Sequence, residues 1–261
     1  MNRRVFVPIG LALAAAIGAA CTAVPTDANR AVSLEFDTTA FPAIVSGDTL
    51  RDSLGVTAPL HPLAYNSLGA VMSGARFSFV TFDTGLTITS AGVVTAQGRN
   101  GTVRFLASIN GIQSVQRTLE ITRRPDTVFA TGKQRDTLVY ALPDVPATNT
   151  YTGIGVTLVS GDSSGGVKFP KGWLVSYRVL YHGLVKPKGD TTVATLLNDG
   201  SLPSVVDTSD ASGLTGRKLR VRPIGLLGNP DSVIVEATAR YKGAQVRGSP
   251  VRFVIITRPK S

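Results

Sequence analysis

Short blocks of alternating apolar and polar residues, separated by turn residues, run through the chain after residue 30. They include residues 32–36, 76–80, 103–107, 174–179, 232–237 and 251–255. Alternation with a period of two places one face of a strand in a core and the other in water. The 27 Gly and 15 Pro residues supply frequent breaks. Short strands with turns at this spacing are typical of a β-sandwich, so we expect an all-β protein.

One phrase occurs twice in nearly the same form. It reads Ile121-Thr122-Arg123-Arg124-Pro125 and later Ile256-Thr257-Arg258-Pro259. The β-branched residues extend a strand, and Pro ends it because it cannot donate to the ladder. A chain of 261 residues is long enough for two ordinary domains. We therefore expect two tandem sandwiches, 31–124 and 125–261, each closed by this strand. The linker between them is nearly absent, which predicts a stiff rod.

The first 20 residues have the pattern of a secretory signal peptide. Arg3 and Arg4 form a positive segment, residues 5–17 are apolar, and three small residues precede Cys21. Cys21 is the only cysteine, so it cannot form an internal disulfide. Cleavage near Ala20 that leaves a free thiol is one interpretation of this arrangement.

A second interpretation follows from the small residues before Cys21, which resemble the lipobox of bacterial lipoproteins, although Gly18 stands where that family prefers Leu. The resemblance implies a diacylglycerol on the Cys21 sulfur, cleavage before Cys21 and acylation, as by palmitate, of the new amino terminus. Thr22, in place of Asp, resembles lipoproteins sent to an outer membrane. Several acyl chains anchor stably, at about 0.8 kcal/mol per buried methylene. Residues 21–30 are then a short lipidated tether.

The first unit resembles bacterial immunoglobulin-like domains of group 2. Residues 46–50 fit their G-x-T-x-x-L phrase loosely, and residues 86–96 and 100–107 fit their G-x-V-T-A turn and the strand after it. The resemblance implies positive φ angles at Gly92 and Gly101. It also implies a central strand at 75–81, where Phe77 and Phe79 stand in place of the family's Trp.

The second unit resembles invasin-like (group 1) immunoglobulin-like domains. Residues 206–215 resemble their T-D-x-x-G-x-A turn, and residues 233–239 and 248–254 resemble the strands that follow. Trp173, the only tryptophan, stands where a sandwich has its central buried aromatic residue. Residues 183–204 form an insertion that we expect to be a long loop or an extra hairpin.

The sequence offers little support for catalysis. Gly161-Asp162-Ser163-Ser164-Gly165 fits G-x-S-x-G, but a serine nucleophile needs an oriented histidine base. Only His61 and His182 exist, and neither has a protease-like flanking phrase. An esterase-type elbow would need a helix after Ser163, and none is predicted. We interpret the phrase as a turn and expect neither enzymatic activity nor a cofactor.

Metal binding has equally weak candidates. Two histidines and one cysteine that we expect to be acylated cannot form a zinc cluster. Asp207, Ser209 and Asp210 could offer oxygens to Ca²⁺, but the spacing of a twelve-residue calcium loop is missing. A hydrogen-bonded Asx turn is the simpler interpretation, and the sequence leaves both open. Asp83, Asp190 and Asp199 also lie in turn-like surroundings and are expected to be structural.

The net charge of +10, or +8 without Arg3 and Arg4, could attract nucleic acid, anionic lipid or anionic glycan. The charges are scattered and lack interleaved aromatics, so we do not expect nucleic-acid binding. Three hypotheses follow for a protein that contacts the membrane through its acyl anchor. It is an adhesion or surface-display module, an accessory scaffold of an envelope protein complex, or a glycan-binding module with exposed Tyr181 and Tyr241.

Overall fold

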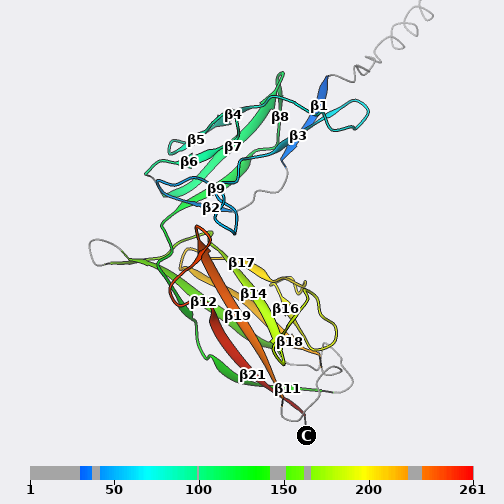
Figure 1. Ribbon diagram of the computed structural model, residues 1–261, viewed down its shortest axis with the longest axis vertical. Coiled ribbons are helices and arrows are strands. Elements are labelled where there is room, and N and C mark those ends of the chain that lie inside the picture. The colour runs from blue at the N-terminus through cyan, green and yellow to red at the C-terminus, as the bar shows by residue number, and fades with distance from the viewer. Residues whose placement is uncertain are drawn as a thin grey trace, which may run out of the picture.

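The computed structural model describes residues 30–36, 42–98, 100–141, 151–161, 166–222 and 231–260. These residues form strands and turns (Figure 1), which confirms the all-β prediction. In these ranges no helix is long and apolar enough to span a membrane. The predicted signal peptide, Cys21 and nearly all of the tether lie outside the described residues, as do Asp162, Ser163, Ser164 and Gly165.

Residues 31–122 form one four-stranded sheet with short pairs around it. Its order is β2 (Ala43–Val45), β9 (Arg117–Thr122), β7 (Gly101–Ile109) and β4 (Ser78–Thr81), with β8 (Ile112–Gln113) beside β7. β1 (Ala31–Phe36) pairs with β3 (Pro62–Asn66), and β5 (Leu86–Ile88) pairs with β6 (Val94–Ala96). The Phe36 and Phe105 rings meet edge to face in the core, with centroids 5.6 Å apart. The expected positive φ angles at Gly92 and Gly101 are confirmed.

Residues 127–259 form two facing sheets. One has the order β10 (Thr127–Ala130), β12 (Tyr151–Gly161), β18 (Leu214–Val221) and β16 (Ala194–Leu197), with β13 (Val167–Lys168) beside β12. The other has the order β11 (Arg135–Tyr140), β21 (Val251–Pro259), β19 (Asp231–Tyr241), β14 (Leu174–Tyr181) and β15 (Leu184–Lys186). β17 (Val206–Thr208) pairs with β14, and β20 (Ala244–Gln245) pairs with β19. The Tyr177 and Thr215 hydroxyls, 2.8 Å apart, bridge the two sheets of this sandwich.

The repeated phrase occupies matching strands, as predicted. Ile121 lies in β9 beside Ile44 of the parallel strand β2, and Ile256 lies in β21 beside Thr137 of the parallel strand β11. Each closing strand also has an antiparallel neighbour, β7 for β9 and β19 for β21. The described strand pairings all fall within 31–122 or within 127–259, which we call the first and second sandwich. The finer boundaries, 31–124 and 125–261, stay a prediction.

Two details of the first sandwich differ from prediction. β4 is an edge strand, not a central one, so Phe77 and Phe79 are only half-buried, whereas Phe105 on the central strand β7 is fully buried. In β1, the pairing with β3 shifts register between Ala31 and Ser33. Such an irregularity breaks the alternation, and Val32 faces solvent instead of the core.

The insertion at 183–204 begins with the expected extra hairpin and then continues beyond it. Its first strand, β15, pairs with β14, whereas its second strand, β16, pairs with β18 in the opposite sheet. The insertion therefore crosses from one sheet to the other. All four residues of β16 are buried, so this segment is part of the core.

Candidate functional site at the junction between the sandwiches

The first sandwich contributes the Asp48 carboxylate, in the turn after β2. The Asp48 N–H donates to the Val45 carbonyl oxygen at 2.9 Å, and Gly47 adopts a φ of 81°. The Asp48 carboxylate accepts a hydrogen bond from the Thr49 N–H at 2.8 Å and lies 3.3 Å from Arg51 Nη2. The turn therefore holds this carboxylate in a fixed position.

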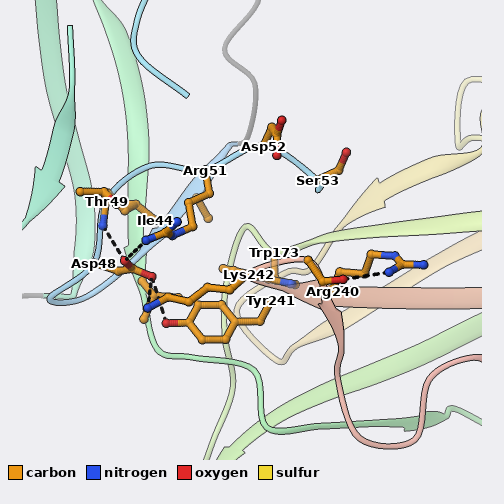
Figure 2. A pocket seen from close by; sticks show the side chains of 13 residues that line it. Ile44, Asp48, Thr49, Arg51, Asp52, Ser53, Trp173, Arg240, Tyr241 and Lys242 are labelled. Atoms are coloured by element: carbon orange, nitrogen blue, oxygen red, sulfur yellow. Dashed lines mark hydrogen bonds and ion pairs between the residues drawn. The ribbon is translucent and has the colours of Figure 1, made fainter. Parts of the chain in front are cut away.

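The second sandwich supplies two further donors to Asp48 from the end of β19 and the turn after it. Tyr241 Oη donates to Asp48 Oδ2 at 3.0 Å, and Lys242 Nζ lies 3.1 Å from the same oxygen. Lys242 and Gly243 both have positive φ, as in a tight hairpin turn. Figure 2 shows the side chains of Arg51, Tyr241 and Lys242 and the backbone nitrogen of Thr49 converging on Asp48. One carboxylate thus joins the two sandwiches.

The protonation of this cluster follows from its contacts. Burial alone would raise the pKa of Asp48, but the donors from Thr49, Lys242, Arg51 and Tyr241 outweigh it and lower the pKa. The hydrogen bond to Asp48 raises the pKa of Lys242. Burial, and then the hydrogen bond to Asp48, raise the pKa of Tyr241. The carboxylate and the ammonium group are therefore both charged across the neutral range.

Trp173 packs behind this cluster. It is 5% exposed, as expected of a buried aromatic residue, and its ring centroid lies 6.0 Å from that of Tyr241. Its expected place at the centre of the sandwich is wrong, because it precedes β14 and lines a gap that also contacts Ile44 of the first sandwich. Tyr177 is the central aromatic residue of β14 instead, with its hydroxyl bonded between the sheets.

A second set of contacts lies along β9. The Lys171 N–H donates to Thr122 Oγ1 at 2.9 Å, and Lys171 Nζ lies 3.0 Å from Glu120 Oε2.

Gly55 contacts the second sandwich so closely that a Cβ on it would lie 2.2 Å from the Lys242 carbonyl carbon. β9 ends at Thr122 and β10 begins at Thr127, so the chain crosses the junction within a few residues. The two sandwiches thus meet at several points.

The gap at this junction has a volume of about 20 Å³. A single water needs about 10–15 Å³ by this measure, so the gap cannot hold a metabolite or cofactor. What the arrangement can do is mechanical, since paired charges and backbone contacts restrict rotation of one sandwich against the other. We call the contacts of Asp48, Tyr241, Lys242 and Trp173 the Asp48 junction.

The residues considered for calcium have other partners. Asp207 lies 2.9 Å from Arg217 and accepts the Gly216 N–H. Asp210 caps its own turn by accepting the N–H groups of Ser212 and Leu214. Within the described ranges, no group of three or more His, Cys, Asp or Glu side chains is placed to hold a metal ion. Ser209 Oγ, the third candidate ligand, accepts the Trp173 N–H at 2.9 Å and donates to the Pro170 carbonyl oxygen.

Asp83 and Asp190 have the structural partners expected, whereas Asp199 is exposed. Asp83 accepts three hydrogen bonds from Arg104, including one from its backbone N–H. Asp190 caps the turn at Thr192 with its carboxylate. These hydrogen bonds give Asp83 and Asp190 the structural role that the sequence predicted for them.

Tyr181 and Tyr241 are not the exposed aromatics expected for glycan binding. Tyr181 is buried, its hydroxyl donates to Asp231, and its ring stacks on that of His182. Tyr241 is half-buried in the Asp48 junction. Both tyrosines lie on strands whose packing turns their rings inward, which overturns the expectation.

His182 lies away from Gly161, the residue of the G-x-S-x-G phrase that the structure describes. His61 is exposed in the first sandwich, just before β3, and His182 follows β14 beside Asp231. Gly161 ends β12, where its N–H donates to Asp126 near the junction. β14 runs from Trp173 at the junction towards His182 at the far end, so Gly161 and His182 lie at opposite ends of the second sandwich.

A shallow hollow of about 510 Å³ lies on the second sandwich. Three glycines lie on its floor. Gly153 and Gly155 are on β12, and Gly216 is on β18, where it pairs with Gly155. Asp199, Asp207 and Asp210 line it with Arg217 and Lys218. Acidic groups outnumber basic ones here, so this surface does not suit an anionic polymer.

Comparison with known proteins finds similarity in structure but not in sequence. No protein-family model and no curated protein matches the sequence. Among solved structures, the chain is similar to domains 4 and 5 of the S-layer protein SbsC (13% identity, TM-score 0.29), covering 87% of this chain and 96% of that one. It is also similar to the Yersinia pseudotuberculosis adhesin InvE (15%, TM-score 0.31, 86% of this chain and 58% of that one).

A third similar structure is the Escherichia coli adhesin FdeC (14% identity, TM-score 0.30, covering 85% of this chain and 63% of that one). The chain therefore spans about three fifths of the length of the two adhesin structures. Identities and TM-scores this low do not assign a function to this protein.

Proposed function

We propose that this protein is an exported, non-enzymatic lipoprotein, anchored through acylated Cys21 to the outer membrane of a bacterial envelope. Its two immunoglobulin-like sandwiches form a stiff spacer that presents the far end of the second sandwich for adhesion or surface display. The Asp48 junction is the observation that carries this proposal. A flexible pair of domains would not need a carboxylate that accepts donors from both sandwiches.

The positions of the strands support the same arrangement. β1 begins at one end of the long axis, and β21 ends at the other (Figure 1). An anchor that precedes β1 would place the first sandwich next to the membrane and the second away from it. The far end of the second sandwich carries the turn between β14 and β15, with Leu184 and Val185 exposed.

Intact mass and membrane fractionation test the anchor. The protein is produced in a bacterium with two membranes, beside a Cys21→Ala variant. We expect a mature chain that begins at Cys21, carries acyl mass and sediments with outer membranes, and a variant that does none of these. Protease treatment of whole cells then tests display: cleavage of the second sandwich supports it. Protection from protease, together with a copurifying envelope protein, would favour the scaffold hypothesis instead.

One observation favours a second candidate function, the binding of a glycan. The hollow on the second sandwich has a glycine floor that leaves backbone accessible to a flat polymer. Its charges favour a neutral, hydroxyl-rich chain over the anionic one expected from net charge. Binding of neutral oligosaccharides, measured by titration calorimetry and lost in Gly155→Val, would support this candidate. Equal binding by the variant would exclude the hollow as the site.

A further inference from the structure

We propose that the end of the first sandwich where β1 begins is a membrane-docking surface that rests on the lipid bilayer. This inference relies on the proposed Cys21 anchor and adds a second contact to it. We call this surface the β1 pole. It consists of the start of β1, the turn after β3 and the segment from the β7–β8 turn to β9, which lie together at one end of the molecule (Figure 1).

The β1 pole exposes several large apolar side chains. Leu68 is 75% exposed, Val71 is 55% exposed and Val115 is 78% exposed, and Val32 is turned outward beside them by the irregularity in β1. β1 pairs with β3, and β8 packs beside β1, so the three segments share one end of the sandwich. Scattered single apolar residues are ordinary on a surface, but several at the tips of adjacent turns form an interaction site.

The turns hold these side chains outward. Asn66 Oδ1 accepts the N–H groups of Leu68 and Ala70, each at 3.0 Å. In the second turn, Ser114 Oγ accepts the Ala107 N–H at 3.0 Å and donates to the Val115 carbonyl oxygen. These bonds fix the turns in the free protein. Leu68 and Val115 therefore lose little conformational entropy when they insert into the lipid.

The charges around the β1 pole complement an anionic lipid surface. Arg30 precedes β1, Arg76 precedes β4 and Arg117 begins β9, and all three are exposed. Residues 66–77 and 110–117 contain no Asp or Glu. Apolar tips with basic neighbours are the pattern by which surface segments bury into the headgroup region, to a depth of about 5–10 Å.

The tether is short enough to keep the β1 pole near the membrane. Arg30 follows Cys21 by nine positions. Nine residues span at most about 30 Å even when fully extended. The β1 pole is therefore held close to the bilayer whenever Cys21 is acylated. Leu184 and Val185, at the far end of the second sandwich, are equally exposed but lie beyond this reach.

Site-specific fluorescence tests the contact on the full acylated chain. Because acylation occupies the only native cysteine, a new one can be labelled alone. Leu68→Cys and the matched control Leu184→Cys carry the same environment-sensitive dye. Each chain is reconstituted into vesicles of phosphatidylethanolamine and phosphatidylglycerol with nitroxide-bearing lipids. We expect blue-shifted emission and nitroxide quenching for the label at 68, and neither effect for the label at 184.

The outcomes separate this inference from the anchor. An acylated chain whose label at 68 is no more quenched than the label at 184 overturns the docking surface and leaves the anchor intact. A blue shift without quenching also overturns it, since protein and not lipid then covers the pole. A chain without acyl mass contradicts both proposals. A Val71→Ser/Val115→Ser variant should lose the quenching at 68, whereas Leu184→Ser/Val185→Ser should keep it.

Discussion

The carboxylate of Asp48 accepts a hydrogen bond from the hydroxyl of Tyr241, 193 positions later in the sequence, at 3.0 Å. This bond crosses from the first sandwich to the second, and Lys242 Nζ reaches the same oxygen at 3.1 Å. Trp173 packs against Tyr241 and is the only tryptophan of the chain. Its fluorescence therefore reports on the junction alone.

Removing the shared carboxylate should open the junction. Asp48→Ala deprives Tyr241 and Lys242 of their acceptor, and we expect the Trp173 emission to shift to the red as water enters. Hydrogen bonds to a charged group contribute about 1.5–3 kcal/mol each, so the junction should also melt earlier. Asp199→Ala removes an exposed carboxylate elsewhere and serves as the control. Unchanged emission in Asp48→Ala would contradict the role given to this residue.

Truncating Trp173 tests the packing behind the cluster. Trp173→Ala should lower the free energy of unfolding by about 3–5 kcal/mol, because a large buried side chain leaves a cavity. Because this variant lacks the only tryptophan, its unfolding is followed by circular dichroism instead of fluorescence. A variant as stable as the wild type would mean that Trp173 lies on the surface.

Alanine substitution at two glycines with similar φ angles can distinguish the effect of backbone strain from that of a steric clash at the junction. Gly55 has a φ of 87° and Gly69 a φ of 75°, so alanine is strained at either position, by about 1–2 kcal/mol. A Cβ on Gly55 would also meet the backbone of Lys242 and Gly243 within 2.5 Å, whereas nothing lies within 4 Å of a Cβ on Gly69. We expect Gly55→Ala to red-shift the Trp173 emission and Gly69→Ala to leave it unchanged.

The junction should weaken at both extremes of pH. The pKa of Asp48 is lowered in the folded protein, so its contribution is present above the unfolded value of about 3.9 and is lost as the pH falls through the folded pKa. The pKa of Lys242 is raised, so its contribution is present below about 10.4 and is lost as the pH rises through the folded pKa. Trp173 emission should be constant from about pH 5 to 9 and shift outside that range. In Asp48→Asn the acid step should vanish; its persistence would assign it to other carboxylates.

The hydroxyl of Tyr177 tests the packing of the second sandwich independently of the junction. Burial raises the pKa of Tyr177, and its hydroxyl lies 2.8 Å from Thr215 Oγ1 between the sheets. Tyr177→Phe leaves the Thr215 hydroxyl buried without this partner, which should cost about 1–3 kcal/mol. The exposed Tyr151 gives the control variant Tyr151→Phe, for which no loss is expected. Equal stability of the two variants would contradict the buried bond.

The sequence alone predicted the strands well and the contacts between units poorly. Alternation identified β7, β14, β19 and β21, and the repeated Ile-Thr-Arg phrase located both closing strands, because these signals depend on neighbours along one strand. The edge position of β4 and the crossing of 183–204 between sheets depend on pairing between distant strands. Period and turn residues carry no information about that pairing.

The same limit explains the residues that sequence reasoning missed. Asp48 lies in the Ser46–Leu50 phrase that resembles the group 2 family, but nothing near it in the sequence indicates that Tyr241 and Lys242 approach its carboxylate. Trp173 was correctly expected to be buried, because a lone tryptophan in an apolar stretch rarely stays exposed. That it packs at the junction follows from the turn at Gly172, whose φ is 73°.

The distance between the two sandwiches, measured by electron–electron double resonance, tests the central claim most directly. Spin labels on Leu68→Cys and Leu184→Cys in the acylated chain lie on different sandwiches, and both positions are exposed. A stiff spacer predicts one narrow distance distribution, which broadens in Asp48→Ala and in Gly55→Ala. A broad distribution in the wild type that neither substitution changes would show that the sandwiches move independently and would contradict the account.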